Sequence, residues 1–516
     1  MAADAPVFQT SHDCMACHNG LTTPAGEDVS FGTAWRATMM ANSARDPYWQ
    51  ASVRRETVDH PGAAAEIEDE CSVCHMPMAR TLDAAAGRLG RVFAHLPVGQ
   101  AAGDAARLAA DGVSCTLCHQ ITPGGFGRRE SFSGGYIIDM QAATARPLFG
   151  PYPVPPGRAT VMHSATGYRP EESAHVRQSE LCATCHTLYT TARGPGGQVV
   201  GELPEQVPYL EWRHSAFRAE RSCQSCHMPV IAEPTRIASV LGEPREAAAR
   251  HDFRGGNFFM LRMLNRYRDE LGVEALPQEL DAGARATVHH LQTGSASIAV
   301  EAHAVKPARL EVDVTVTNLA GHKLPTAYPS RRAWIHMVVR DGPGQVIFES
   351  GSMAGNGSIA GNDNDADGAR FEPHHVEITL PDQVQVYESV MVDSRGAVTT
   401  GLLSGIRFVK DNRLLPRGFD QASAGLDIAV QGAAARDEDF RGGSDRVRYR
   451  IPTGSHRGPW RIDVALRYQP IAYRWAENLR GYAGSEPARF VRYYESMAAT
   501  SSEILARHSI TVDPAR

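Results

Sequence analysis

The pattern Cys-x-x-Cys-His occurs five times in the first half of the chain and uses all 10 cysteines. In this pattern both thiols can add to the vinyl groups of one haem, and the histidine can ligate the iron from the proximal side. The two intervening residues let both sulfur atoms reach one porphyrin edge. The pattern therefore predicts five covalent haems. The thioether cysteines are Cys14, Cys17, Cys71, Cys74, Cys115, Cys118, Cys182, Cys185, Cys223 and Cys226, and the proximal histidines are His18, His75, His119, His186 and His227.

The main alternative for paired cysteines is a zinc site or a redox-active thiol pair. A bare Cys-x-x-Cys would leave that alternative open, but here a histidine follows every pair. Cysteines of secreted proteins usually form disulfides, and thioether bonds to haem would consume them instead. The repeats therefore favour covalent haem over a metal-binding or thiol-rich domain.

Size and charge limit the other possibilities. A chain of 516 residues is too long for one hydrophobic core, so we expect two or three domains. The formal net charge is -6 and no run of Lys or Arg occurs. These properties argue against a nucleic-acid partner and against attraction to an anionic membrane surface.

The sequence contains no apolar run of about 18 residues, so no transmembrane helix is predicted. The N-terminal residues Met1-Ala-Ala-Asp-Ala-Pro6 lack the basic and apolar regions of a signal peptide. Haem is attached to this cysteine pattern outside the bacterial cytoplasm. We therefore expect a secreted protein of the periplasm or cell exterior whose leader was removed, with Met1 added afterwards.

Residues 1–255 carry all five repeats and are predicted to form a multihaem cytochrome c domain of short helices and loops with little sheet. A haem is a large apolar body, so five of them can supply most of the core. Stretches rich in Gly and Pro, such as residues 124–127 and 151–156, fit long loops. Helices are expected at residues 32–43, 100–111 and 209–220.

Residues 256–293 are predicted to form a helical connector, because Phe258, Leu261 and Leu264 recur at helical spacing. From residue 294 to 516 the period changes to two, and several short strands predict an antiparallel β-sandwich-like domain with C-terminal helices. Strands are expected at residues 299–301, 310–316, 334–339, 345–348, 375–380, 447–451, 460–468 and 510–512, and helices at 473–479 and 486–497.

Six longer phrases lie around and beyond the repeats: Trp35–Pro47, Asp111–His119, Tyr209–Phe217, Arg250–Asn257, Gly321–Pro329 and Lys410–Phe419. They resemble a family of bacterial multihaem c-type cytochromes, here in a pentahaem form, over nearly the whole chain. The haem half is also distantly similar to the tetrahaem cytochromes of nitrifying bacteria. The resemblance implies a secreted redox protein without a settled substrate. Relatives often have Pro-Thr-Gly after Gly-His, whereas this chain has Pro325-Thr326-Ala327, so we expect that turn to differ.

The second axial ligand of each iron separates an electron carrier from an open site. A second His or Met closes the iron, and an open position lets a small molecule bind. The first half has more additional histidines than the five irons need as second ligands. His60 and His95 lie in polar, loop-like sequence where a solvated side chain is expected. The distal candidates in this half are His12, Met40, His163, His175, His214 and His251. For Met40 the alternative is a core residue.

His322 is a distal candidate from the half without cysteines. It follows a predicted strand in a Gly-His-Lys-Leu-Pro turn, from which it could reach a haem and tie the domains together. A turn histidine bonded to the backbone fits the sequence equally well.

The segment Asp363-Asn-Asp365-Ala-Asp367-Gly368 matches the first half of a calcium loop. Alternating carboxylates can converge on one hard cation. The twelfth position is His374 where an EF-hand has a bidentate Glu, so this is not an EF-hand. We predict a structural Ca²⁺ held by Asp363, Asp365 and Asp367, and the alternative is an acidic surface turn.

Three functions remain open on the sequence. The favoured one is electron transfer through closely spaced haems, with redox proteins as donors and acceptors and with possible self-assembly into an oligomer or filament. The alternative is a multihaem oxidoreductase with one open haem that acts on a small nitrogen or sulfur compound. No Cys-x-x-Cys-Lys pattern, the lysine-ligated haem site of one nitrite reductase family, is present, and its absence argues against the enzyme hypothesis. In a third reading the β-rich domain recognises a partner and the haems relay electrons.

Overall fold

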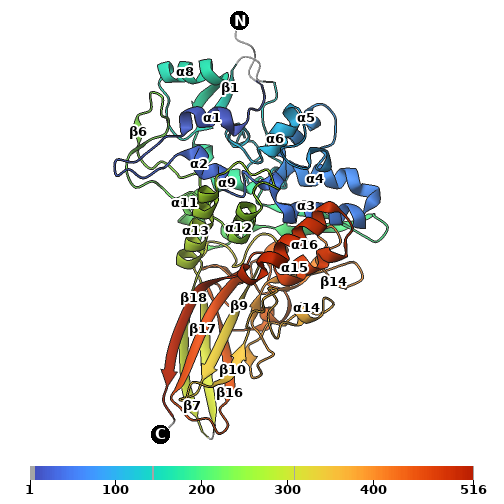
Figure 1. The fold of residues 1–516 in the computed structure, drawn as a ribbon, viewed down its shortest axis with the longest axis vertical. Coiled ribbons are helices and arrows are strands. Elements are labelled where there is room, and N and C mark those ends of the chain that lie inside the picture. The colour runs from blue at the N-terminus through green and yellow to red at the C-terminus, as the bar shows by residue number, and fades with distance from the viewer. Residues whose placement is uncertain (1–5, 142–144, 307, 515–516) are drawn as a thin grey trace. The chain divides into compact units, whose positions relative to one another are not determined.

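The computed structural model describes residues 6–141, 145–306 and 308–514 and divides the chain into two compact units (Figure 1). The first unit comprises Met1–Leu188 and Arg221–Thr287, and the second comprises Tyr189–Glu220 and Val288–Arg516. The chain therefore enters the second unit twice, and all five repeats lie in the first. The boundaries predicted at residues 255 and 293 stay predictions, and the sequence did not indicate that residues 189–220 cluster with the β-rich part.

The first unit consists mainly of short helices joined by long loops. Each repeat lies in or at the end of one such helix, namely α1, α4, α7, α9 and α11. The helices are α1 (Ser11–His18), α2 (Phe31–Arg36), α3 (Pro47–Asp59), α4 (Ala64–His75), α5 (Pro77–Ala85), α6 (Asp104–Ala110), α7 (Cys115–Cys118), α8 (Pro156–Thr166), α9 (Ser179–Ala183), α11 (Cys223–His227), α12 (Phe258–Arg266) and α13 (Pro277–Gly294), of which the last ends in the second unit. The strands described here form pairs: β1 (Arg146–Gly150) with β2 (Tyr168–Glu172), and β5 (Thr235–Arg236) with β6 (Pro244–Arg245).

Helix α2 ends at Arg36 rather than continuing to residue 43 as predicted. Side chains replace the helical hydrogen bonds beyond that point. The Thr38 hydroxyl donates to the Trp35 carbonyl over 2.7 Å, and the Asn42 amide donates to the Thr38 carbonyl over 2.8 Å. Thr and Asn compete with the helix in this way because their short polar side chains reach the local backbone. The predicted helix at 209–220 is likewise cut short, with α10 spanning Pro208–Arg213.

The second unit is built on two larger sheets. One has the strand order β10 (Val346–Ser350), β9 (Arg332–Arg340), β17 (Trp460–Gln469), β18 (Glu503–Val512), with β12 (Val386–Tyr387) also paired to β9. The other has the order β11 (Glu377–Ile378), β16 (Ser444–Pro452), β8 (Arg309–Asn318), β7 (Ala296–Val305). All described pairings within these two sheets are antiparallel except β11 with β16. Figure 1 shows β9, β17 and β18 side by side as one layer.

The buried faces of the two sheets meet in the core of the second unit. Along β8 and β16 buried and partly exposed residues alternate, as the period of two predicts. The rings of Phe348 from one sheet and Tyr449 from the other meet edge to face with centroids 6.2 Å apart. On the outer face Arg448 and Asp313 are register partners whose side chains pair over 2.9 Å. The alternation therefore separates an apolar interior from a charged exterior.

The rest of the second unit consists of smaller elements. These are β3 (Leu188–Arg193), β4 (Val199–Gln206), α10, α14 (Asp363–Ala366), β13 (Ser389–Val392), β14 (Val398–Thr399), β15 (Arg407–Asp411), α15 (Tyr473–Glu477) and α16 (Ser485–Met497). Segment 189–220 is tied to the later part by Glu211, which accepts from the Thr326 hydroxyl over 2.5 Å and lies 2.9 Å from Arg413. Arg413 in turn pairs with Asp411, and Lys323 reaches Asp411 over 2.7 Å. Four buried charges of two signs thus balance one another.

The turn at Ala327 has an unusual backbone conformation. Ala327 has φ of +65°, in the left-handed region that favours glycine. The alanine therefore holds a strained backbone conformation.

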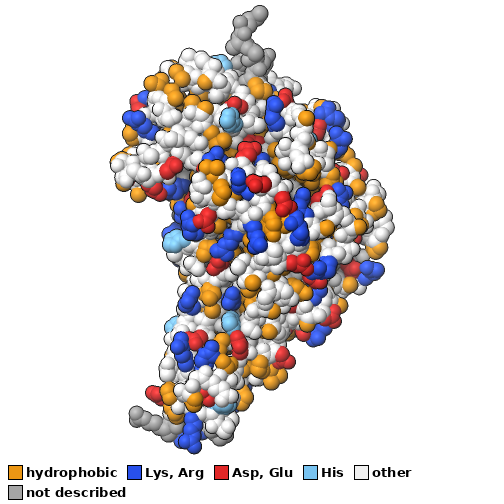
Figure 2. Space-filling model, in the orientation of Figure 1, with side chains coloured by type: hydrophobic (Ala, Val, Ile, Leu, Met, Phe, Trp, Pro, Cys, Tyr) orange, Lys and Arg blue, Asp and Glu red, His pale blue; other side chains and the backbone are white. Residues whose placement is uncertain are grey.

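Surface charges are mixed. Figure 2 shows acidic and basic side chains interspersed on the viewed face, without a broad area of one sign. None of the helices in the described part of the chain is long and apolar enough to span a membrane.

Candidate functional site

The histidines of the repeats are held in the tautomer that a metal requires. Since a backbone carbonyl can only accept, a ring nitrogen that faces it must carry the proton, and the other nitrogen keeps its lone pair. Four repeat histidines present Nδ1 to a carbonyl in this way. The pairs are His18 with Ile237 (2.6 Å), His75 with Ser43 (3.0 Å), His119 with Phe149 (2.6 Å), and His227 with Arg254.

Burial favours the neutral form of three of these rings. It lowers the pKa of His75 to about 4, and it also lowers the pKa values of His18 and His119. A neutral imidazole with a free Nε2 is a metal ligand, whereas a protonated one is not. The donor set of these repeats therefore fits haem iron, with the cysteines one turn away for the covalent attachment.

The His251 ring lies near the His119 ring and almost parallel to it. The two ring centroids are 6.4 Å apart and the planes differ by 17°. Metal–imidazole bonds are about 2 Å long, so two imidazoles on either side of one ion have centroids on the order of 6 Å apart. His251 also presents Nδ1 to a carbonyl, that of Ala249 at 3.1 Å, and burial lowers its pKa to about 4. Of the predicted distal residues, the described contacts support His251 best.

An apolar ring separates this pair from the first repeat. Phe31 lies 4.5 Å from His251 and 6.4 Å from His18, in both cases with nearly parallel planes. The rings of the first and third repeats therefore lie in one aromatic row, with α2 supplying the phenyl group.

Thiols of different repeats lie close enough to shift one another's pKa values. The three pairs are Cys14 with Cys115, Cys74 with Cys185, and Cys182 with Cys223. Cys118 and Cys185 also interact electrostatically. Because the two thiols of a repeat mark one edge of its haem, these contacts gather the attachment points of all five repeats into a single cluster.

His163 carries an orphaned polar atom. Its Nδ1, on helix α8, is buried and has no hydrogen-bond partner. Such an atom is costly unless a ligand satisfies it. An iron would do so, and the predicted role of His163 as a ligand is therefore physically reasonable.

His175 is placed differently. Its Nδ1 lies 2.6 Å from the Ser173 hydroxyl, and its Nε2 lies 2.8 Å from the Ile121 carbonyl. Both ring nitrogens are thus used by the protein, and no lone pair remains for a metal. These contacts argue against the predicted ligand role of His175.

Two further candidates of the first unit show no comparable feature. His12 is exposed at the start of α1. Met40 is half-buried, and its carbonyl accepts from the Val113 N–H over 2.9 Å.

Gly112, beside Val113, has φ of +61°, and a Cβ there would lie 2.6 Å from the Met40 carbonyl. The glycine in the phrase around the third repeat is explained by this close approach of two backbones.

His214 and His322 belong to the second unit. His214 donates from Nε2 to the Asp420 carbonyl over 2.8 Å, and its ring meets Phe419 edge to face. His322 has its Nδ1 2.9 Å from the Lys323 carbonyl. Both assignments as haem ligands stay predictions.

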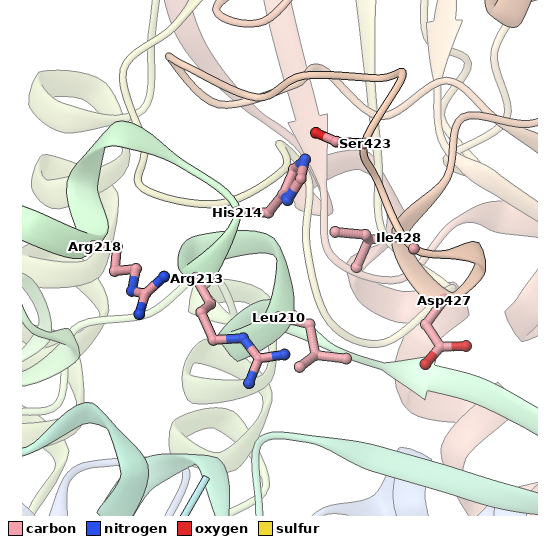
Figure 3. Close-up of a pocket in the computed structure, with 8 residues that line it drawn as sticks. Leu210, Arg213, His214, Arg218, Ser423, Asp427 and Ile428 are labelled. Atoms are coloured by element: carbon pink, nitrogen blue, oxygen red, sulfur yellow. The ribbon is translucent and has the colours of Figure 1, made fainter. Parts of the chain in front are cut away.

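His214 also lines a cavity of about 330 Å³ in the second unit (Figure 3). Figure 3 shows Arg213 and Arg218 on one side and Ser423, Asp427 and Ile428 on the other. Asp427 is already engaged by the Tyr189 hydroxyl at 2.5 Å. Within the described residues neither arginine pairs with a carboxylate. The cavity can therefore accept a small anion.

The predicted calcium ligands are not gathered together. Asp365 is buried and accepts from Arg332 over 2.8 Å and from the Ile359 N–H over 2.7 Å. Asp363 pairs with Arg370, and Asp367 accepts from the Ala369 N–H. Each carboxylate is thus used by protein donors, and this arrangement does not favour a Ca²⁺.

A buried group in the second unit was missed by the sequence analysis. Atoms of His374, Asp437 and Asp445 lie within 4.8 Å of one another, and no other cluster of this kind is found in the described residues. Burial raises the pKa of Asp445 to about 7. The acidic residues are separated from His374 by more than 60 positions in the chain, so no local pattern could have revealed the group.

The hydrogen bonds around His374 argue against a metal ion there. Amide groups of Gln385 and Asn412 donate to its Nδ1 over 2.8 and 3.1 Å, and their own carbonyl oxygens accept from backbone N–H groups. Nδ1 must therefore be the acceptor, and Nε2 donates to Asp437 over 2.9 Å. With both nitrogens used, His374 keeps no lone pair for a metal ion.

Comparison with known proteins shows a likeness to solved structures. No family model matches the chain, and no curated protein matches it in sequence. A solved structure, the penta-heme cytochrome c552 from Thermochromatium tepidum, is similar over 98% of this chain and 100% of that chain, with a TM-score of 0.57 and 15% identity. The chain thus has the fold of a multihaem cytochrome.

Proposed function

We propose that this protein is a multihaem c-type cytochrome that transfers electrons through five covalently bound haems outside the cytoplasm. The observation that carries the proposal is the shared state of the repeat histidines. Four of them donate Nδ1–H to a backbone carbonyl and keep Nε2 for a metal, next to paired cysteines. Redox proteins would be the donors and acceptors.

Contacts between the repeats support a route for the electrons. The thiol pairs join the first repeat to the third, the second to the fourth, and the fourth to the fifth, while Cys118 and Cys185 join the third to the fourth. Electrons pass between haems whose edges are close. The fourth haem would then be a branch point with three neighbours.

The side chains of the protein would set the properties of each haem, which supplies the one-electron chemistry when bound. In four of the proximal histidines the hydrogen bond from Nδ1 fixes the ring and raises its basicity, and burial excludes water. We assign His251 as the distal partner of His119 and keep His163 as a ligand of a second haem. His12, Met40, His214 and His322 remain weaker candidates, and His175 is the weakest.

Haem content tests the core of this proposal. We expect a pyridine haemochrome spectrum for five haems, and a mass that exceeds the polypeptide by five haem groups. A colourless protein of polypeptide mass would refute it. Light scattering and electron microscopy test whether copies assemble into an oligomer or filament.

The distal assignment has its own test. His251→Ala should open the iron of the third repeat, because the imidazole opposite His119 is lost. Carbon monoxide should then bind to the reduced protein, and a high-spin ferric signal should appear. His175→Ala is the matched control and should change neither. Unchanged spectra for His251→Ala would exclude His251 as a ligand.

The second candidate function is a multihaem oxidoreductase acting on a small nitrogen or sulfur compound. The observation that favours it is the cavity with Arg213 and Arg218, whose charge suits an anion. This function requires an open iron in the unmodified protein. Wholly low-spin haem in that protein would reject it.

A further inference from the structure

Trp49 covers one face of the His75 imidazole in the second repeat. The ring centroids are 4.3 Å apart and the planes differ by 2°. Trp49 lies in the first turn of helix α3, and it is almost fully buried. The neighbouring aromatic ring of the first repeat, Phe31, lies much further from its histidine, at 6.4 Å.

The position of Trp49 is fixed by the start of its helix. The carboxylate of Asp46 accepts from the backbone N–H groups of Tyr48 at 2.8 Å and Trp49 at 3.2 Å. An acidic N-cap of this kind satisfies the free donors of the first turn. The indole is therefore carried on a well-anchored backbone.

The edge of the same imidazole is held by the residues just before that helix. His75 donates from Nδ1 to the Ser43 carbonyl over 3.0 Å, and the Ser43 hydroxyl donates back to the His75 carbonyl over 2.8 Å. Ser43 is in turn next to Ala44, whose carbonyl accepts from the Gln50 amide over 2.7 Å. One continuous segment, residues 43–50, thus contacts both the edge and the face of the ring.

We infer that Trp49 is a positioning residue that sets the ring plane of His75 and shields its Nδ1–H bond from water; this inference rests on the haem proposed at the second repeat. A single hydrogen bond leaves an axial imidazole able to turn about its bond to the metal. A parallel indole in contact with the face removes that freedom, because any rotation would drive the two rings together. The surroundings of the ligand also set the potential of the metal.

Replacement of the ring tests this role. Trp49→Leu should shift one of the ferric EPR signals and one of the midpoint potentials, while haem content stays at five. Trp49→Phe keeps a flat face and should restore both. If Trp49→Leu does not fold, Trp49→Met is the substitute, since its flexible side chain fills space without a ring plane. The signal of the second haem is identified by its absence in a variant with Cys71→Ser and Cys74→Ser.

The matched control is Trp35→Leu. Trp35 is a buried indole of the same unit, and its Nε1 donates to the Val113 carbonyl over 3.0 Å. It should lower stability without moving the signal of the second haem. The inference is overturned if Trp49→Leu and Trp49→Met leave that signal and potential unchanged, or if Trp35→Leu shifts them equally. Absence of haem from the unmodified protein would instead defeat the proposed function.

Discussion

The two units build their interiors by different means. The second unit has long strands whose alternate residues, such as Val312 and Val447, form a continuous apolar layer between two sheets. In the first unit one small apolar cluster consists of Phe8, Met78, Leu108 and Leu117. The helices of this unit are short and its loops long. The comparison teaches that the first unit needs apolar material beyond its own side chains, and five haems would provide it.

The largest expected effect comes from removing the haems. Replacement of all cysteines by serine should prevent the first unit from folding, because its core would be lost, and should leave the strands of the second unit formed. Limited proteolysis with mass spectrometry would locate the cleavage sites, and circular dichroism would report the remaining sheet. Equal protease resistance of both units would contradict this difference between them.

A smaller effect is expected from a buried charge of the second unit. Asp411→Ala leaves Lys323 and Arg413 without their shared carboxylate, and breaking such a buried pair costs about 3–5 kcal/mol. Urea unfolding followed by circular dichroism would measure the loss, and the haem spectrum should stay unchanged. Asp463→Ala, which removes an exposed partner of Arg461, is the control and should cost about 1 kcal/mol or less. Equal losses would show that the network is not stabilising.

The pH dependence of the stability of the second unit tests the protonation state of the buried Asp445. Burial raises the pKa of Asp445 from 3.8 to about 7, so the folded state binds a proton that the unfolded state releases. Stability from this group is therefore complete below about pH 4 and is lost as the pH rises through about 7. Asp445→Asn should remove that slope. Urea midpoints across this range would measure it, and an unchanged slope would exclude Asp445 as its source.

The smallest expected effect concerns the strained turn. Ala327→Gly should stabilise the second unit by about 0.5–1 kcal/mol, because glycine adopts positive φ without a Cβ clash. Ala429→Gly is the control, since Ala429 has φ of -63° and should gain nothing. Thermal unfolding compares the two. A destabilised Ala327→Gly protein would mean that the alanine methyl group contributes packing.

Regular alternation made the second unit easier to predict than the first. The predicted strands at 310–316, 447–451 and 460–468 lie inside β8, β16 and β17, because burial of one sheet face leaves a period of two. The hairpin β3–β4 and the strands β13–β15 were not predicted. Their segments carry no clear period of two in the sequence, although their pairing partners lie close by in the chain.

Prediction of the candidate site from the sequence was also limited to local patterns. Local spacing was enough to propose the haem attachment residues, since the chemistry demands neighbours in sequence. It could not show which distal candidates have a free ring nitrogen, because a sequence gives the position of a histidine and not its contacts. His251 lies in one of the phrases that resemble the multihaem cytochromes and His175 does not, but only the structure shows that His175 has both nitrogens bonded while His251 keeps one available.

The chain enters the second unit twice, and this limits where the protein can be cut into fragments that fold. A fragment that ends at residue 255 would carry residues 189–220 without Leu403, whose carbonyl accepts from the Arg193 N–H, and without Arg413 beside Glu211. During synthesis, residues 189–220 likewise cannot form these contacts until most of the chain has been made. A shortened version suited to study alone would need residues 189–220 excised and the ends rejoined by a linker.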